Sequence, residues 1–225
     1  VESLIQKLKN SGLVSGDRVA ILSKNNVAFI ELLYASSKYG LVLVPLNFRL
    51  AYPEINFILS DSGSKVLFYE PEFEGIVKQL EKDKLSLTGL IKIGFDGKYV
   101  GFNESQPSSK AINFSESKNV PLFQMYTSGT TGKPKGVMIT HGMIKTMALS
   151  YFADVDQVHP TDATLYAAPM SHGAGLYSIM HVQAGARHAI PVSGGFDEDE
   201  IFDLAEKLQN IHMFAAPTMV KRLTN

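Results

Sequence analysis

Residues 18–45 read RVAILSKNNVAFIELLYASSKYGLVLVP, and this stretch decides the fold. Arg18–Leu22 is a short run rich in β-branched residues, which predicts a strand. Val27–Tyr39 is long enough for a helix and has flanking residues typical of helix ends. Leu41–Val44 is a second buried-strand candidate, which we expect to end at Pro45. Two strands joined by a helix predict a parallel β-α-β unit, because parallel strands need a long crossover connection.

The same alternation continues over most of the chain. Further helices are predicted at residues 53–62, 71–82 and 175–184, and one begins at Glu198. Further strands are predicted at residues 65–69, 90–93, 164–168, 187–192 and 211–215. Asp197 and Glu200 have the spacing of a capping box at the start of the last of these helices. The pattern predicts an α/β fold with a mostly parallel sheet flanked by helices.

Changes in this rhythm divide the chain into four parts. Residues 1–93 form a first α/β segment, and residues 94–120, rich in Ser, Asn, Lys and Gly, form an irregular connection with at most one short hairpin. Residues 121–142 predict a strand, a loop and a strand. Residues 143–225 form a second α/β segment whose pattern continues to the last residue.

Composition excludes several classes of protein. The 225 residues are 45% hydrophobic and 19% charged, as in ordinary globular domains, and the net charge of −1 argues against a general nucleic-acid binder. The absence of cysteine excludes disulfides, thiolate metal sites and a cysteine nucleophile. No apolar run approaches the roughly 20 residues of a membrane span. The sequence begins at Val1 without a recognisable signal peptide, and we expect a cytoplasmic protein.

Residues 126–136 read YTSGTTGKPKG, a dense run of hydroxyls, glycines and lysines. Glycines let backbone N–H groups approach an anion, and lysines add charge-assisted hydrogen bonds. The run is not a Walker loop, because its glycines are too close together and Pro134 follows the lysine. A solvated Ser/Thr/Gly-rich turn is the alternative, but apolar strands on both sides disfavour it. The candidate phosphate-binding residues are Thr127, Ser128, Gly129, Thr130, Thr131, Gly132, Lys133 and Lys135.

A second candidate site follows the strand predicted at residues 164–168. His172 lies beyond its carboxyl end, where open α/β sheets bind ligands, and Gly173 and Gly175 follow it. A histidine in such a place is also commonly a packed or surface residue, and the glycines are equally explained by close helix–strand packing. No metal-binding residues are predicted in this chain.

Three motifs resemble those of the adenylate-forming superfamily, which includes acyl-CoA synthetases, luciferases and the adenylation domains of peptide synthetases. The strongest is YTSGTTGKPKGVMITH at residues 126–141, which is similar to the family's phosphate loop. The run KYGLVLVPLN at residues 38–47, with Glu54 and DSGSKVL at residues 61–67, resembles an upstream pattern. The run APMSHGAG at residues 168–175 resembles a downstream one.

The resemblance implies an AMP-forming ligase that uses ATP, Mg²⁺ and CoA. A carboxylate, expected to be that of a fatty or related acid, attacks the α-phosphate of ATP, and a thiol then displaces AMP from the acyl-adenylate. The candidate loop residues would hold the phosphates, which magnesium would bridge, and His172 with Gly173 and Gly175 would line the acyl pocket. Gly142 and Met143 depart from the Arg or Lys and the Asn that often follow the loop.

The resemblance also implies parts that this sequence does not contain. The family's later magnesium-binding and ribose-binding segments are absent before Asn225, and so is the small C-terminal domain with the catalytic lysine. We therefore expect an inactive N-terminal fragment with no catalytic residue of its own. Two alternatives stay open: an adenylation domain that loads a carrier protein, and a non-catalytic nucleotide- or phosphate-binding module. Small-molecule partners are expected, and the oligomeric state is not predicted.

Overall fold

The structure is a computed structural model that describes residues 1–83, 87, 89–93, 99–100, 119–127 and 133–224. It divides into two compact units. Unit 1 comprises Val1–Ser23 and Val27–Met143, and unit 2 comprises Lys24–Asn26 and Ile144–Asn225. Among the described residues, no helix is both long and apolar enough to cross a membrane.

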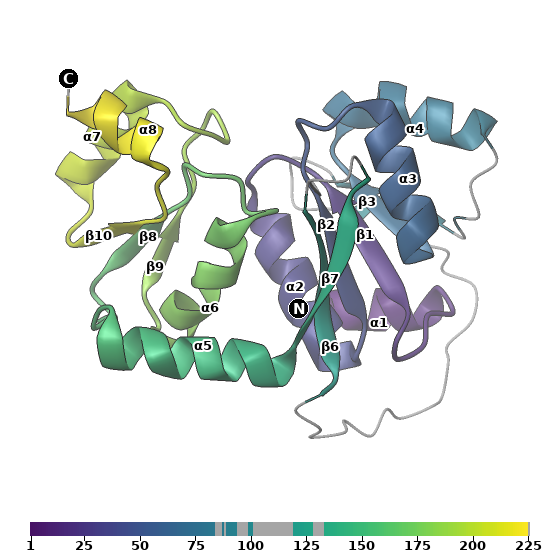
Figure 1. The fold of residues 1–225 in the computed structure, drawn as a ribbon, viewed down its shortest axis with the longest axis horizontal. Coiled ribbons are helices and arrows are strands. Elements are labelled where there is room, and N and C mark those ends of the chain that lie inside the picture. Colours follow the sequence, from purple (N-terminus) through teal and green to yellow (C-terminus); the bar gives the residue numbers. More distant parts are fainter. Residues whose placement is uncertain (84–86, 88, 94–98, 101–118, 128–132, 225) are drawn as a thin grey trace. The chain divides into compact units, whose positions relative to one another are not determined.

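Unit 1 is built on a seven-stranded sheet with the order β5-β4-β3-β1-β2-β6-β7 (Figure 1). Its strands are β1 Arg18–Leu22, β2 Val42–Leu46, β3 Val66–Tyr69, β4 Gly89–Ile93, β5 Tyr99–Val100, β6 Pro121–Thr127 and β7 Lys135–Thr140. The five inner strands are parallel, whereas β5 and β7 pair antiparallel at the two edges. The β1-α2-β2 crossover predicted from residues 18–45 is confirmed at the centre of this sheet.

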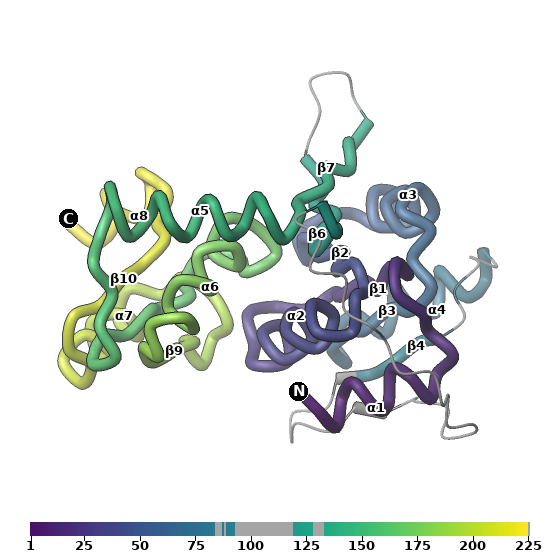
Figure 2. Tube along the Cα trace, turned by 90° about the horizontal axis from the view of Figure 1, so that it is seen from below, coloured from purple at the N-terminus to yellow at the C-terminus, as the bar shows by residue number. Residues whose placement is uncertain are grey.

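Helices cover both faces of the larger sheet. They are α1 Glu2–Asn10, α2 Val27–Tyr39, α3 Tyr52–Ser62 and α4 Glu74–Lys82, the last preceded by a 3-10 turn at Pro71–Phe73. Alternate strand residues such as Ala20, Val44 and Leu67 pack against buried residues of α3 and α4. Figure 2 shows α1 and α2 on the other side of the strands. The strands are buried on both faces, as expected for a parallel sheet flanked by helices.

Unit 2 has a smaller parallel sheet of β8 Ala163–Leu165, β9 Arg187–Ala189 and β10 Ile211–Met213, in the order β10-β8-β9. Its helices are α5 His141–Asp154, which begins in unit 1, α6 Gly173–Ala184, α7 Glu198–Lys207 and α8 Pro217–Leu223. Figure 1 shows α5 and α6 on one side of these strands and α7 and α8 on the other. Buried residues form a separate cluster on each side, so this sheet is also covered on both faces.

The expectation that the second strand ends at Pro45 is wrong, because β2 runs to Leu46 and Pro45 pairs with Ile21. The N–H of Val42 donates to Asp17 O on the β1 side. The hydrogen-bonding groups of successive strand residues point to opposite sides, so those of Pro45 point toward β6. Among the described residues, the only register pair between β2 and β6 is Leu43 with Phe123. A residue without an N–H is tolerated there because no ladder bond is lost.

The smaller strands end earlier than predicted. β8 ends at Leu165 and not at Ala168, because the following backbone turns to bond with the side chain of Asn25. β9 ends at Ala189, shortly before Pro191, and β10 ends at Met213. Short strands are expected where prolines and side-chain bonds interrupt the ladder.

Helix α5 was not predicted from the sequence. Its apolar residues are spread around the axis, with Ile144 and Ala148 buried but Met143 and Leu149 exposed, so no helical period is visible. The sequence did contain one signal for this helix, which is the N-cap residue Thr140. Its Oγ1 accepts a hydrogen bond from Met143 N at 3.3 Å.

The capping box at α7 is half formed. Asp197 Oδ1 accepts a bond from Glu200 N at 3.0 Å, as predicted. The carboxylate of Glu200, however, accepts from the backbone N–H of Ser193 at 3.2 Å and also from its hydroxyl, instead of returning to the cap residue. Glu200 therefore ties the preceding loop to the helix.

Candidate functional site

The predicted strand-loop-strand is a β-hairpin made by β6 and β7 at the edge of the larger sheet. Thr127 ends β6 directly opposite Lys135, which begins β7, and Lys133 lies just before it. The side chains of all three residues are exposed. The remaining loop residues of the prediction lie outside the described residues: Ser128, Gly129, Thr130, Thr131 and Gly132.

A chain of hydrogen bonds fixes β6 immediately before this loop. Arg18 Nε donates to Gln124 Oε1 at 3.1 Å, and Gln124 Nε2 donates to the hydroxyl of Tyr126 at 3.0 Å. The same hydroxyl donates to Asp61 Oδ2 at 2.5 Å. Burial, reinforced by the bond to Asp61, raises the pKa of Tyr126, so the hydroxyl keeps its proton. These side chains from β1, β6 and α3 anchor the first residue of the YTSGTTGKPKG run.

Gly136, the last residue of that run, is explained by the same network. A Cβ atom at this position would lie 2.7 Å from Gln124 Nε2 and 3.0 Å from Tyr126 Cζ. Real Cβ atoms essentially never approach so closely, and any side chain here would push the two partners apart. The glycine therefore lets β7 pass over the anchored side chains of β6.

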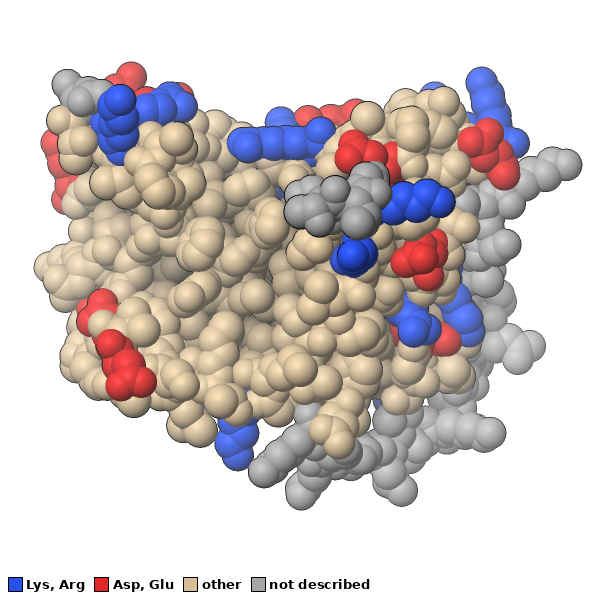
Figure 3. Space-filling view, in the orientation of Figure 1, with Lys and Arg blue, Asp and Glu red and all other residues tan. Residues whose placement is uncertain are grey.

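The described residues at the hairpin end suit a polyphosphate. One hydroxyl and two ammonium groups face solvent together, and lysine forms charge-assisted bonds to phosphate oxygens. The positive charge is local: Figure 3 shows Lys and Arg mixed with Asp and Glu on the described residues of the face drawn, without a continuous basic surface. That distribution fits a small anion better than a nucleic acid.

His172 is the residue immediately before α6, and its side chain is exposed. Its N–H donates to Pro169 O at 3.1 Å, and its carbonyl accepts from Gly175 N at 3.0 Å. Gly173 begins the helix, and a Cβ there would lie 2.6 Å from Cζ of Phe214. Gly175 is buried within the first turn. Gly173 is thus needed for the close approach of an aromatic ring.

Asn25 was missed by the sequence analysis. Its buried amide Nδ2 donates to both Tyr166 O and Ala168 O at 2.9 Å, and its Oδ1 accepts from Met170 N at 2.7 Å. These three bonds hold the segment that carries the backbone from β8 to His172. Only the run SKNN at residues 23–26 offered a signal, and it reads as an ordinary loop.

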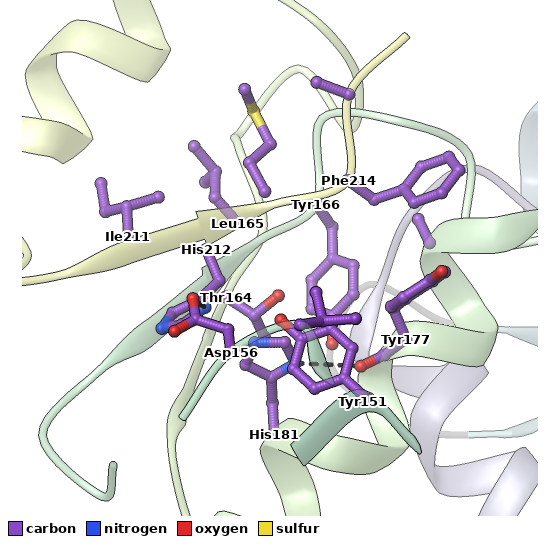
Figure 4. A pocket seen from close by; sticks show the side chains of 14 residues that line it. Tyr151, Asp156, Thr164, Leu165, Tyr166, Tyr177, His181, Ile211, His212 and Phe214 are labelled. Carbon is purple, nitrogen blue, oxygen red and sulfur yellow. Dashed lines mark hydrogen bonds and ion pairs between the residues drawn. The ribbon is translucent and has the colours of Figure 1, made fainter. Parts of the chain in front are cut away.

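A cavity of about 430 Å³ lies within unit 2, beside Gly173 (Figure 4). Most of its lining is apolar or aromatic, and the polar side chains come from α5, α6, β8 and β10 and from Asp156 after α5. The lining residues are Tyr151, Val155, Asp156, Thr164, Leu165, Tyr166, Ala174, Tyr177, His181, Ile211, His212, Met213, Phe214 and Ala215.

Two histidines meet at the polar end of this cavity. The rings of His181 and His212 are 5.1 Å apart and nearly perpendicular. His212 lies between two carboxylates, with Nδ1 3.4 Å from Asp156 Oδ2 and Nε2 3.2 Å from Asp162 Oδ2. A hydrogen bond from the backbone N–H of His159, together with Asn210 and His212, lowers the pKa of Asp162. The carboxylate of Asp162, which contacts His212 Nε2, is therefore stabilised in its ionised form.

His181 has a different environment from His212. It is 3% exposed, and its Nδ1 lies 2.9 Å from the carbonyl oxygen of Tyr177, one helical turn earlier. Its Nε2 is buried and has no hydrogen-bond partner among the described residues. Burial lowers the pKa of His181. Figure 4 shows the ring reaching up from α6 toward His212.

Among the described residues, no group of three or more His, Cys, Asp or Glu side chains has an arrangement that could hold a metal ion.

A comparison with protein families decides the relationship. The profile of the AMP-binding enzymes matches residues 1–225. The chain belongs to this family of adenylate-forming enzymes. Its relatives include a long-chain-fatty-acid–CoA ligase of Mycobacterium tuberculosis, 39% identical over 75% of this chain, and a feruloyl-CoA synthase of Amycolatopsis, 30% identical over 99%. This AMP-binding chain covers 33% and 43% of these two relatives, less than half of either.

Solved structures agree with this membership. The N-terminal domain of FACL13 from Mycobacterium tuberculosis superposes with a TM-score of 0.82 at 29% identity, over 98% of this chain and 55% of that one. ATP-bound MatB from Rhodopseudomonas palustris gives a TM-score of 0.80 at 25% identity, over 99% of this chain and 45% of that one. The expected fold, a mostly parallel α/β sheet of an adenylate-forming N-terminal domain, is confirmed.

Proposed function

We propose that the protein is an acid–thiol ligase that activates a carboxylic acid, of the fatty or a related class, with ATP and then transfers it to CoA. Membership of the AMP-binding family supports an AMP-forming ligase. The observation that carries the phosphate half of the proposal is the hairpin end, where Thr127, Lys133 and Lys135 are exposed together. The domain boundaries and the cytoplasmic location expected from the sequence remain predictions.

In the first step, a carboxylate oxygen of the acid attacks the α-phosphorus of ATP, and pyrophosphate leaves with the electron pair of the broken P–O bond. Negative charge grows on the departing oxygens, and lysine ammonium groups placed beside them stabilise that charge. Lys133 and Lys135, with the hydroxyl of Thr127 and residues 128–132, would hold the β- and γ-phosphates, and a bound magnesium ion would supply further neutralisation of the phosphate charge. A thiol then attacks the acyl carbon and releases AMP.

The hydrogen-bond network at the start of the hairpin loop supports this arrangement, because groups that bind a reacting phosphate must be held in position. Tyr126 is held by Gln124 and Asp61, and that holding positions the start of the loop. His172, Gly173 and Gly175 form the proposed acyl subsite in unit 2. The step needs a further positive group on the acid and α-phosphate, which in this family comes from a part not contained in residues 1–225.

A carrier protein in place of CoA is the second candidate acceptor. A fatty acid–[acyl-carrier-protein] ligase, ScoC of Streptomyces coeruleorubidus, is 31% identical over 96% of this chain. The indoleacetate–CoA ligase of Aromatoleum aromaticum is equally similar, 31% identical over 92%. Acyl transfer to a phosphopantetheine-loaded carrier, without transfer to free CoA, would favour the carrier.

The test is carboxylate-dependent exchange between ATP and pyrophosphate, with the protein expressed from its complete gene and acids from acetate to palmitate plus aryl acids. We expect exchange with one class of acid. Lys135→Ala should slow it about ten- to a hundredfold, as for loss of a charge-assisted bond. Lys145→Ala, an exposed lysine on α5, is the control and should leave it unchanged. A folded protein that binds ATP but shows no exchange with any acid would leave only a phosphate-binding module.

Residues 1–225 produced alone form a further arm of this test. Because the expected catalytic lysine lies outside them, we expect no exchange from this piece. Robust exchange would show that the piece is sufficient and that the expectation of an inactive fragment is wrong.

A further inference from the structure

The end of the hairpin that carries Thr127 extends past the last register pair between β6 and β2. Among the described residues, that pair is Leu43 with Phe123. The next β2 residue whose hydrogen-bonding groups point toward β6 is Pro45, and proline has no N–H to donate. Beyond Phe123, β6 continues its antiparallel register with β7 as far as Thr127. The hairpin end therefore needs side chains to attach it firmly to the rest of unit 1.

Tyr126 supplies this attachment on the side of α3. Its ring packs against the core cluster formed by buried residues of β1, β2, β3, α3 and α4. Its hydroxyl donates to Asp61 Oδ2 at 2.5 Å. Asp61 lies in the last turn of α3, 65 residues before Tyr126 in the sequence. One hydrogen bond thus joins the hairpin end to a helix that is anchored elsewhere in the unit.

The direction of each hydrogen bond between Arg18 and Asp61 is determined by the two ends of the chain. A guanidinium can only donate, so Gln124 must present Oε1 to Arg18 and Nε2 to Tyr126. The hydroxyl of Tyr126 accepts from Gln124, which leaves its own proton for Asp61, and a carboxylate can only accept. Turning the Gln124 amide over would break two bonds at once. The chain therefore holds the Tyr126 side chain in a single orientation.

The position of Asp61 within α3 indicates that its carboxylate does not serve the helix itself. The carbonyl groups at the end of a helix carry partial negative charge, which disfavours an acidic side chain in the last turn. Gly63, in a left-handed conformation, already caps this end through its N–H. The bond to Tyr126 accounts for an acidic residue at this place. It also accounts for the first residue of the run DSGSKVL, to which the proposed function assigns no role.

We propose that Asp61 is a positioning residue for ATP, which acts through Tyr126 to hold the end of the hairpin in place before the nucleotide binds. Thr127 follows Tyr126 directly and lies opposite Lys135, so both proposed phosphate-binding groups depend on where Tyr126 is held. Groups that are already ordered lose less conformational entropy on binding, which raises affinity. This inference rests on the phosphate-binding role proposed above.

The test measures ATP affinity by calorimetry on the protein expressed from its complete gene, together with KM for ATP and for the acid in the exchange reaction. We expect Asp61→Ala to weaken ATP binding about five- to tenfold, as for loss of one partly exposed hydrogen bond. KM for ATP should rise in proportion, and KM for the acid should not change. Asp61→Asn should stay within about threefold of the wild type, because its amide oxygen can still accept the Tyr126 proton.

A double-mutant cycle tests the route from Asp61 to the hairpin. Tyr126→Phe removes the same hydrogen bond from its other end and should weaken ATP binding by at least as much as Asp61→Ala does. Adding Asp61→Ala to Tyr126→Phe should then weaken binding by less than about a further twofold, because residues that act through one contact are not additive.

Asp83→Ala is the matched control. The carboxylate of Asp83, at the end of α4, accepts a hydrogen bond from the hydroxyl of Tyr52 in α3. It is therefore a tyrosine–aspartate pair of the same kind that does not involve the hairpin. Asp83→Ala should leave ATP affinity unchanged, and urea denaturation of all variants separates losses of stability from losses of ATP affinity.

The outcomes separate this inference from the function proposed above. Unchanged ATP affinity in Asp61→Ala, or a loss no greater than that in Asp83→Ala, would overturn the inference even if exchange occurs. Additive losses in the double-mutant cycle would also overturn it, since Asp61 would not then act through Tyr126. ATP affinity that depends on Asp61, without exchange with any acid, would support the inference and refute the ligase.

Discussion

At the scale of single residues, the short side chain of Asn25 holds a backbone segment of the proposed acyl subsite in place. Its amide uses both donor positions and its oxygen, all on one backbone segment, and all three bonds are 2.9 Å or shorter. The segment holds Ala168, Pro169 and Met170, which precede His172. A residue from the loop after β1 thus fixes the backbone of the proposed acyl subsite.

We predict that Asn25→Ala lowers the free energy of unfolding by about 1–3 kcal/mol, because buried backbone groups lose their partners. It should also weaken binding of the acid. Chemical denaturation and calorimetry measure the two effects.

Asn25→Asp is the companion variant for this prediction. It keeps the acceptor for Met170 N but loses both donors and places a carboxylate beside two carbonyl oxygens. It should destabilise the protein at least as much as Asn25→Ala does. Unchanged stability in both variants would contradict the structural role of the amide.

The individual site residues also differ in whether they could be predicted from the sequence. Thr127, Lys133 and Lys135 were predicted together because they are close in the sequence. In the structure, the hairpin places Thr127 opposite Lys135. Asn25 and His181 were not predicted, since their partners are far away in the sequence or belong to the backbone. An unpaired Nε2 can only be recognised once the fold defines what surrounds it.

At the scale of elements, the β6–β7 hairpin is a rigid base for its loop. Its register runs without interruption from Phe123 to Thr127, and side chains from β1 and α3 brace it. Stability of the hairpin and position of the loop should therefore change together.

We predict that Gly136→Ala destabilises unit 1 by about 1–3 kcal/mol, the usual cost of overpacking. It should also weaken ATP binding, because Gln124 and Tyr126 must move. Denaturation and nucleotide titration measure the two effects.

Gly75→Ala provides the control, since it lies in α4 with nothing within 4 Å of the added Cβ. It should stabilise the protein by about 0.5–1 kcal/mol. If Gly136→Ala stabilised the protein as Gly75→Ala is expected to do, the close contact at Gly136 would not affect the free energy of unfolding.

Periodicity predicted the elements with clear boundaries. Helix α2 matches its predicted range from end to end, and α3 ends at Ser62 as predicted, followed by Gly63 with a left-handed φ of 62°. Helix α5 was not predicted because its apolar residues are not concentrated on one face. Pro45 misled because a strand tolerates proline at a position where no ladder bond from its N–H is needed, here on the side facing β6, and the sequence does not reveal such positions.

At the scale of the whole molecule, three histidines make the stability depend on pH. Burial lowers the pKa of His141, His181 and His188 below the ordinary 6.5. Well above pH 6.5, these groups are neutral in both the folded and the unfolded chain. As the pH falls below 6.5, the unfolded chain binds protons first, so the folded state loses relative stability.

We therefore predict that the free energy of unfolding decreases between pH 7.5 and pH 5.5. His181→Leu should flatten this decrease, because one proton-binding difference is removed. Urea denaturation at several pH values measures both slopes. A wild-type stability that does not change over this range would show that these histidines titrate as they do in the unfolded chain.

The strand order of the larger sheet also predicts the order in which its strands pair during folding. The first strand of the chain, β1, is central, and β2 and β3 follow soon after and pair on its two sides. β6 reaches β2 only after a much longer excursion, and closing a longer loop costs more entropy. Nearby pairings form more readily than remote ones, so we expect pulse-labelled amides of β1, β2 and β3 to gain protection before those of β6 and β7. The hairpin proposed to hold ATP would then dock onto a sheet that has already nucleated.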